Sequence, residues 1–267
     1  MPTVDINGAT VSYRVDGNGP ALVLISGTGG NLYANWDHLM PAFTADRMVL
    51  RADYAGTGDT VDPTPILTIE RLAEQILAAV EDAGIHRYDL VGYSLGTAIA
   101  MHIAAERPQQ VRSLTLLAGY ACGRDARFDL QAQLWLNLVD RDHTDFARLI
   151  MITGLSPQAL SAFEQQQVDG WINAIRTSNN WEGLRRQADL DRRLDVTRQL
   201  PKIKAPTLSI GCTHDHIVPP QHARAIAAAI PGARYEELPA GHLAVLEQAD
   251  AFARLVLEFS APFAFGE

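Results

Sequence analysis

The sequence is short of cysteine and of long apolar runs. Its 267 residues include two cysteines, Cys122 and Cys212, which cannot build the disulfide framework of a small secreted domain. No apolar run approaches the length of a membrane span, and the first residues lack the basic and apolar regions of a signal peptide. We therefore expect a cytoplasmic protein that has no membrane partner.

Basic residues are also scarce, with 22 Lys and Arg against 31 Asp and Glu, and the net charge is −9. Nucleic acids and anionic membranes attract a basic surface, so this balance argues against both as main partners. Hydrophobic residues make up 47% of the chain, as in a soluble globular protein. The length suits one large domain, or a core with an insertion.

The most informative stretch is the G-x-S-x-G pattern at residues 92–96. Residues 88–91, which are apolar except for Asp89, predict a buried strand, whereas residues 95–107 predict a helix that Pro108 ends. Ser94 would therefore lie on a sharp turn between strand and helix. The first amides of that helix favour negative charge beside the hydroxyl. This context indicates a nucleophile with half of an oxyanion hole next to it.

Strand and helix signals alternate over most of the remaining chain. An Asn7-Gly8 turn predicts a hairpin at the start, and residues 36–43, 68–83, 219–230 and 243–259 predict helices. The fold class that follows is α/β, a mostly parallel eight-stranded sheet with helices on both faces and an antiparallel hairpin at one edge. Strands are expected at residues 4–6, 10–15, 21–25, 47–53, 88–91, 113–117, 207–210 and 234–238.

Strand signals vanish between residues 122 and 200. Residues 130–138, 146–150, 157–175 and 181–194 have helical patterns, and three of the four tryptophans, Trp135, Trp171 and Trp181, lie in this region. We predict a helical cap insertion at 122–200 over the strand ends, and a core made of 1–121 and 201–267. An alternation of Arg and Asp within residues 185–195 favours a solvated helix face.

Two loops that follow late strands carry the partners a nucleophilic serine needs. Asp215 follows the predicted strand at 207–210, and His242 follows the one at 234–238. Reactive groups gather at the carboxyl ends of parallel strands, where a serine needs a base and the base needs an orienting group. Asp125, in the loop after the strand at 113–117, is a rival for the acid.

In these motifs the chain resembles the α/β-hydrolase fold family, over residues 1–120 and 201–267, in the family order Ser, acid, His. The resemblance implies that Ser94 is the nucleophile, His242 the general base and later acid, and Asp215 the orienter of His242. It also implies an oxyanion hole made of the backbone N–H groups of Leu95 and Thr28.

The chain departs from the family pattern at two places. The oxyanion loop starts with Ser26-Gly27 where the family often has His-Gly, so its supporting hydrogen bonds must differ. In the stretch at 53–60, Ala55 stands where the family usually has an arginine, so a structural ion pair is missing. Neither change affects the three catalytic candidates.

The expected function is that of a serine hydrolase, acting on a small, partly hydrophobic carboxylic ester or lactone without cofactor or metal. Gly27 and Tyr93, together with the cap tryptophans named above, are the pocket candidates. A thioesterase acting on acyl carrier protein or coenzyme A thioesters is an alternative. A ligand-sensing or partner-activating protein with little turnover is another. His214 and His216 flank Asp215, but no third metal ligand is evident, and no oligomeric state is predicted.

The two cysteines follow strands that should be neighbours. Cys122 and Cys212 could therefore lie close together near the active site. Two small buried thiols are the simpler interpretation, because free cysteine packs as a hydrophobic residue. A reactive thiol that lines the pocket is the alternative.

Overall fold

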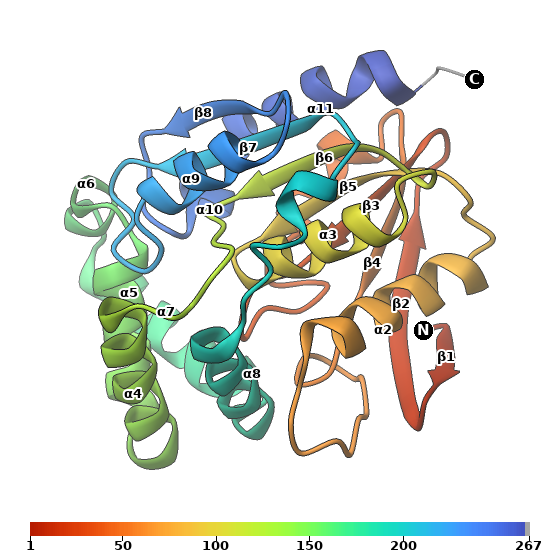
Figure 1. Cartoon of the computed structure of the whole chain (residues 1–267). Coiled ribbons are helices and arrows are strands. Elements are labelled where there is room, and N and C mark those ends of the chain that lie inside the picture. Colours follow the sequence, from red (N-terminus) through yellow and green to blue (C-terminus); the bar gives the residue numbers. More distant parts are fainter. Residues whose placement is uncertain (265–267) are drawn as a thin grey trace.

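One sheet of eight strands organises the molecule, in the order β1-β2-β4-β3-β5-β6-β7-β8 (Figure 1). The computed structural model describes residues 1–264. The strands are β1 (Thr3–Ile6), β2 (Ala9–Asp16), β3 (Ala21–Ile25), β4 (Met48–Ala52), β5 (Tyr88–Tyr93), β6 (Val111–Leu117), β7 (Thr207–Cys212) and β8 (Arg234–Leu238).

The pairing confirms the predicted mixture of strand directions. β1 pairs with β2 and β2 with β4 in antiparallel fashion, and the remaining neighbours pair in parallel. Asn7 and Gly8 form the turn of the first hairpin with φ values of 48° and 80°. Two consecutive positive φ angles are what a two-residue hairpin turn requires, and Asn and Gly adopt them at low cost. The parallel strands β3 to β8 thus end at one common edge.

Helices cover both faces of the sheet, as predicted (Figure 1). Buried apolar side chains of α2 (Ile69–Asp82), α3 (Leu95–Glu106) and α9 (Gln221–Ala229) belong to one core cluster. Those of α1 (Met40–Phe43), α10 (Ala244–Glu247) and α11 (Ala249–Ala264) belong to the other. The helix predicted at 36–43 is a 3₁₀ turn, η1 (Asp37–Leu39), followed by α1, and the one predicted at 243–259 is divided into α10 and α11.

Between β6 and β7 the described structure is helical, and Figure 1 shows these helices gathered beyond one end of the sheet. The prediction of one helix at 157–175 is wrong, because the chain breaks after α6. Glu164 and Gln167 form a capping box that starts α7 anew. The helices are α4 (Ala126–Arg141), α5 (His143–Gly154), α6 (Pro157–Ser161), α7 (Gln165–Ser178) and α8 (Trp181–Arg193), and η2 (Leu200–Lys202) leads back to β7.

Two of these helices differ in how they meet the rest of the molecule. The backbone of α8 approaches the loop after β4 so closely that a Cβ on Gly183 would lie 2.2 Å from the carbonyl oxygen of Gly56. Only glycine permits this approach. By contrast, α7 contains no buried residue. Within residues 1–264, no helix is long and apolar enough to cross a membrane.

Candidate active site

Ser94 lies at the turn between β5 and α3, in a conformation that few residues adopt. Its φ is 53° and its ψ is −123°, a sparsely populated region that costs on the order of 1–3 kcal/mol. The turn fits because its glycines leave room: a Cβ on Gly92 would lie 2.5 Å from the carbonyl oxygen of Gly96, and a Cβ on Gly96 2.3 Å from that of Ile25. This turn places the Ser94 side chain above the edge of the sheet.

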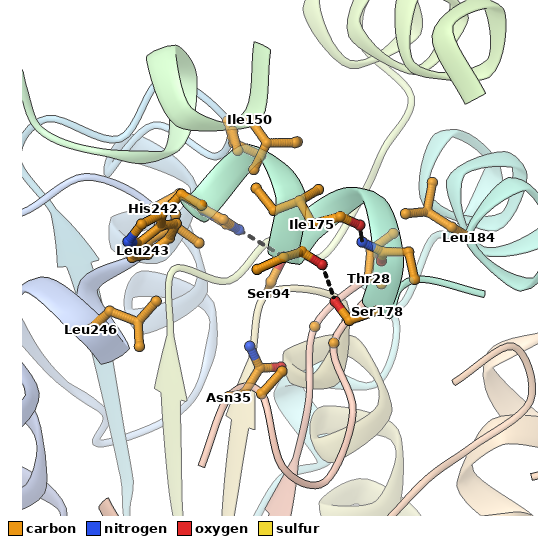
Figure 2. Close-up of a pocket in the computed structure, with 18 of the residues that line it drawn as sticks. Thr28, Asn35, Ser94, Ile150, Ile175, Ser178, Leu184, His242, Leu243 and Leu246 are labelled. Atoms are coloured by element: carbon orange, nitrogen blue, oxygen red, sulfur yellow. Dashed lines mark hydrogen bonds between the residues drawn. The ribbon is translucent and has the colours of Figure 1, made fainter. Parts of the chain in front are cut away.

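Three side chains from three separate loops form a continuous hydrogen-bonded chain. His242 Nε2 lies 2.9 Å from Ser94 Oγ, and His242 Nδ1 lies 2.7 Å from Asp215 Oδ2. Figure 2 shows the contact between His242 and Ser94. All three residues are buried. The other carboxylate oxygen of Asp215 accepts hydrogen bonds from the N–H groups of Ile217 and Val218, at 2.8 and 2.7 Å. Asp215 is therefore held in place on both oxygens.

Neighbouring groups contact His242 and Asp125 in different ways. The hydroxyl of Tyr93 donates to the carbonyl oxygen of His242 at 3.0 Å, and the two rings lie 5.3 Å apart between centroids. Asp125 instead caps α4, where its side chain accepts from the N–H of Phe128. Of the two aspartates, Asp215 is the one that contacts the imidazole.

The loop after β3 presents the second amide expected for an oxyanion hole. Among the hydrogen bonds of residues 1–264, none uses the N–H of Thr28 or of Leu95 as donor, so both are free to bind a ligand oxygen. The hydroxyl of Tyr54 donates to the carbonyl oxygens of Ser26 and Gly27, at 2.9 and 3.0 Å. In a trans peptide the C=O and N–H point in opposite directions, so fixing the Gly27 carbonyl also fixes the Thr28 N–H.

Other side chains take over where the sequence departs from the family pattern. The hydroxyl of Ser26 accepts from Trp36 Nε1 at 2.8 Å and donates to the carbonyl oxygen of Asn31 at 3.1 Å. At Ala55, the side chain of Gln75 accepts from the backbone N–H and that of Gln187 donates to the carbonyl oxygen. Hydrogen bonds from uncharged side chains thus support both loops at these two positions.

The interpretation of residues 185–195 as a solvated face is wrong for Asp191. Its side chain accepts hydrogen bonds from the hydroxyls of Thr28 and Tyr120, both at 2.7 Å, and Gln187 Oε1 accepts from the N–H of Gly29. Burial raises the pKa of Asp191 to about 6, although the hydrogen bonds from Tyr120 and Thr28 favour its ionised form. Leu184, Gln187, Ala188 and Asp191 recur at helical spacing, which is the sequence signal that could have identified this inner face.

A cavity of about 360 Å³ opens above Ser94 and His242. Four of the pocket candidates, Gly27, Tyr93, Trp135 and Trp171, line it. Trp181 does not, because its ring stacks on His143 at 3.6 Å and meets the edge of Phe146. Ile175, an apolar residue of the predicted insertion, also lines the cavity. Sequence analysis did not identify the other aliphatic walls, which are labelled in Figure 2, or the ring beside them: Ile150, Leu184, Leu243 and Leu246, with Phe146.

The remaining candidates lie away from this cavity. Neither cysteine lines it: Cys212 is buried at the end of β7, where burial raises the pKa of its thiol, and Cys122 Sγ accepts from the N–H of Arg124. The strands that precede the two cysteines are neighbours, as predicted. Within residues 1–264 no group of three or more His, Cys, Asp or Glu side chains could hold a metal ion.

Comparison with known proteins gives a consistent family assignment. A sequence profile described as alpha/beta hydrolase fold matches residues 20–249. The chain is 44% identical to pyrrolizixenacetamide deacetylase of Xenorhabdus hominickii, over 97% of each chain. Its structure is similar to a hydrolase from Pseudomonas aeruginosa (TM-score 0.85, 30% identity, 97% of each chain). It is also similar to the enol-lactonase from Burkholderia xenovorans (TM-score 0.84, 26% identity, 97% of this chain and 100% of the other).

Proposed function

Since the chain belongs to the α/β-hydrolase fold family and is a hydrolase, we propose that it cleaves a small, partly hydrophobic carboxylic ester or lactone through an acyl-enzyme on Ser94. The observation that carries this proposal is the contact sequence Ser94–His242–Asp215 at the base of a largely apolar cavity. The fold itself is compatible with many reactions, so the proposal depends on the site.

Acylation follows from the positions of the three side chains. The Oγ of Ser94 attacks the acyl carbon while its proton moves to His242 Nε2. The bond from the acyl carbon to the leaving oxygen then breaks, and His242 returns the proton to that oxygen. Asp215 keeps the Nδ1 proton of His242 in place and stabilises the imidazolium formed in between.

Deacylation repeats the same steps with water as the nucleophile. His242 Nε2 takes a proton from water, the new oxygen–carbon bond forms, and the bond to Ser94 Oγ breaks as the proton returns to it. In both halves the acyl oxygen becomes negative in the tetrahedral intermediate. The N–H groups of Thr28 and Leu95 are proposed to bind it there, which contributes about 10²–10³-fold per donor in enzymes of this kind.

The substrate part of the proposal concerns the helices between β6 and β7. We propose that α4 to α8 form a cap whose apolar side chains receive the hydrophobic part of the substrate. Trp135 of α4, Phe146 of α5 and Ile175 of α7 all line the cavity, which favours a role of these helices in binding the hydrophobic part of the substrate. A cavity of about 360 Å³ is in the range of small-molecule sites.

A second candidate reaction is hydrolysis of an acetamide. The relative that is 44% identical is named pyrrolizixenacetamide deacetylase, and this observation favours amide cleavage by the same residues. His242 would then protonate a leaving nitrogen instead of an oxygen. Thioesters of an acyl carrier protein or of coenzyme A are an alternative class of substrate.

Initial rates on matched substrates decide among these reactions. The purified protein and the Ser94→Ala variant would each be given an aryl acetate, an acetanilide and an aryl thioacetate that carry the same aromatic ring and differ in the leaving atom. Ester cleavage that Ser94→Ala abolishes supports the main proposal, and a preference for the acetamide would shift it to the second. A protein that cleaves none of the three would favour the ligand-sensing alternative and contradict the proposal.

A further inference from the structure

Asn35 is a polar residue of the large cavity that the proposed chemistry does not use. It lies just before Trp36, in the turn between β3 and η1, and its half-buried side chain lines the cavity together with Ser94 and His242. Figure 2 shows its amide at the cavity wall opposite Ile150, with the nitrogen pointing toward Ser94.

The amide of Asn35 lacks hydrogen-bond partners within residues 1–264. Its Oδ1 is buried without a partner, and its Nδ2 makes none of the side-chain hydrogen bonds of the described structure. An amide in a mostly apolar cavity costs free energy when unpaired, on the order of 1–3 kcal/mol for a buried group. That cost concerns the buried Oδ1. Nδ2 is not among the buried unpartnered atoms of the described residues, and it leaves a donor at the cavity wall for a ligand acceptor.

The surrounding structure nevertheless holds this amide in place. A Cβ on Gly30 would lie 1.9 Å from Asn35 Oδ1, so the amide fills the space that the glycine leaves. The next residue, Trp36, is held by two hydrogen bonds. Its indole N–H donates to Ser26 Oγ, and its backbone N–H donates to the carbonyl oxygen of Tyr33. The Asn35 side chain is therefore fixed with Oδ1 toward the wall and Nδ2 toward the cavity.

Three other hydroxyl or amide side chains of the cavity wall already donate a hydrogen bond within the protein. Ser178 Oγ donates to the carbonyl oxygen of Ala174, Asn179 Nδ2 to that of Ile175, and Thr28 Oγ1 to Asp191. No Lys or Arg lines the cavity in the described part of the chain. A negatively charged ligand group would therefore find no cation beside it, and a neutral acceptor such as a carbonyl oxygen fits better.

We propose that Asn35 Nδ2 donates a hydrogen bond to a second, non-reacting carbonyl oxygen of the substrate, and so selects cyclic or chain substrates that carry one beside the scissile acyl group. This inference rests on the proposed function and specifies its substrate class. The aromatic walls at Trp135 and Trp171 enclose the apolar remainder of the same molecule. A site with a fixed donor discriminates strongly against the analogue that leaves the donor unpaired.

The test compares 2-oxocyclopentyl acetate with cyclopentyl acetate, which differ by the second carbonyl. Asn35→Leu replaces the amide by an apolar group of similar size, and Asn35→Asp keeps the shape without the N–H donors. Both variants should lower kcat/KM for the oxo ester about tenfold to hundredfold and change that for cyclopentyl acetate by about twofold or less. Ser178→Ala is the matched control, because its hydroxyl already bonds within α7, and it should leave the ratio unchanged.

Two results would overturn the inference without affecting the proposed function. One is a wild-type protein that cleaves p-nitrophenyl acetate but has no preference for the oxo ester. The other is an equal loss on both esters in Asn35→Leu and Asn35→Asp, which would mean that Asn35 only shapes the wall. A wild-type protein that cleaves no ester at all would instead contradict the proposed function on which the inference rests.

Discussion

Asp215 and Asp125 both follow strands, and their contacts predict a large effect of substitution at the first and a small effect at the second. Asp215 lies 2.7 Å from His242 Nδ1, whereas Asp125 caps α4. Asp215→Asn should lower kcat by about 10³–10⁴-fold, because an amide holds the imidazole in the wrong tautomer. Asp125→Asn should change kcat by less than about threefold, since asparagine also caps helices. Steady-state kinetics of both variants on one ester tests this, and a reversed order would assign the acid role to Asp125.

Asp191 predicts a dependence of stability on pH. Burial raises its pKa to about 6, above that of an unfolded aspartate, so the folded protein binds the proton more tightly than the unfolded chain. The free energy of unfolding should therefore fall as the pH rises from about 4 to about 6. Asp191→Asn removes this dependence, and across that window the wild type should lose about 3 kcal/mol relative to the variant.

Urea denaturation of both proteins between about pH 4 and about pH 7 measures that difference. Any constant loss caused by the amide at position 191 cancels, because the prediction concerns the change with pH. Glu258→Gln, on the exposed side of α11, is the control and should follow the wild type. Parallel curves for the wild type and Asp191→Asn would show that Asp191 ionises normally in the folded protein.

At the scale of helices, two of the three tryptophans between β6 and β7 should have different roles. Trp171 of α7 lines the cavity, whereas Trp181 of α8 packs on His143 and Phe146. Trp171→Ala should lower kcat/KM for a bulky ester about tenfold relative to a short one, because it removes a wall of the cavity. Trp181→Ala should lower the free energy of unfolding by about 2 kcal/mol and affect both esters alike. Measuring kcat/KM on the two esters, together with urea denaturation, separates these effects. The same ratio of kcat/KM values for the bulky and the short ester in both variants would contradict the two roles.

Helices and strands with a strong local signal were predictable from the sequence. The helix predicted at 68–83 is α2, which Thr68 caps by accepting from the N–H of Arg71, and the apolar stretches at 21–25 and 88–91 correspond to β3 and β5. Helix boundaries that depend on a capping side chain were harder to predict from the sequence. Glu164 separates α6 from α7, although the apolar spacing continues through this position. Local pattern cannot rank a cap against periodicity when both are present.

At the scale of the whole molecule, sequence order predicted which side chains come together at the sheet edge better than it predicted the lining of the cavity. Ser94, Asp215 and His242 all follow strands, and parallel strands bring their ends together whatever fills the interior. The cavity instead depends on how α4 to α8 dock, through contacts between residues far apart in sequence, such as Thr28 with Asp191. Asn35 has no sequence motif of its own, and the helical spacing of Gln187 and Asp191 indicates an inner face without naming its partners, so only the folded structure identifies these contacts.

The proposed mechanism requires Ser94 to accept the acyl group of the substrate. The most direct test is the mass of the intact protein, rapidly quenched during turnover of p-nitrophenyl acetate, with peptide mapping of the modified form. The wild type should carry one acetyl group on Ser94, and Ser94→Ala should carry none there and lose turnover by several orders of magnitude. Turnover that persists in Ser94→Ala, or an acetyl intermediate on another residue, would contradict the claim.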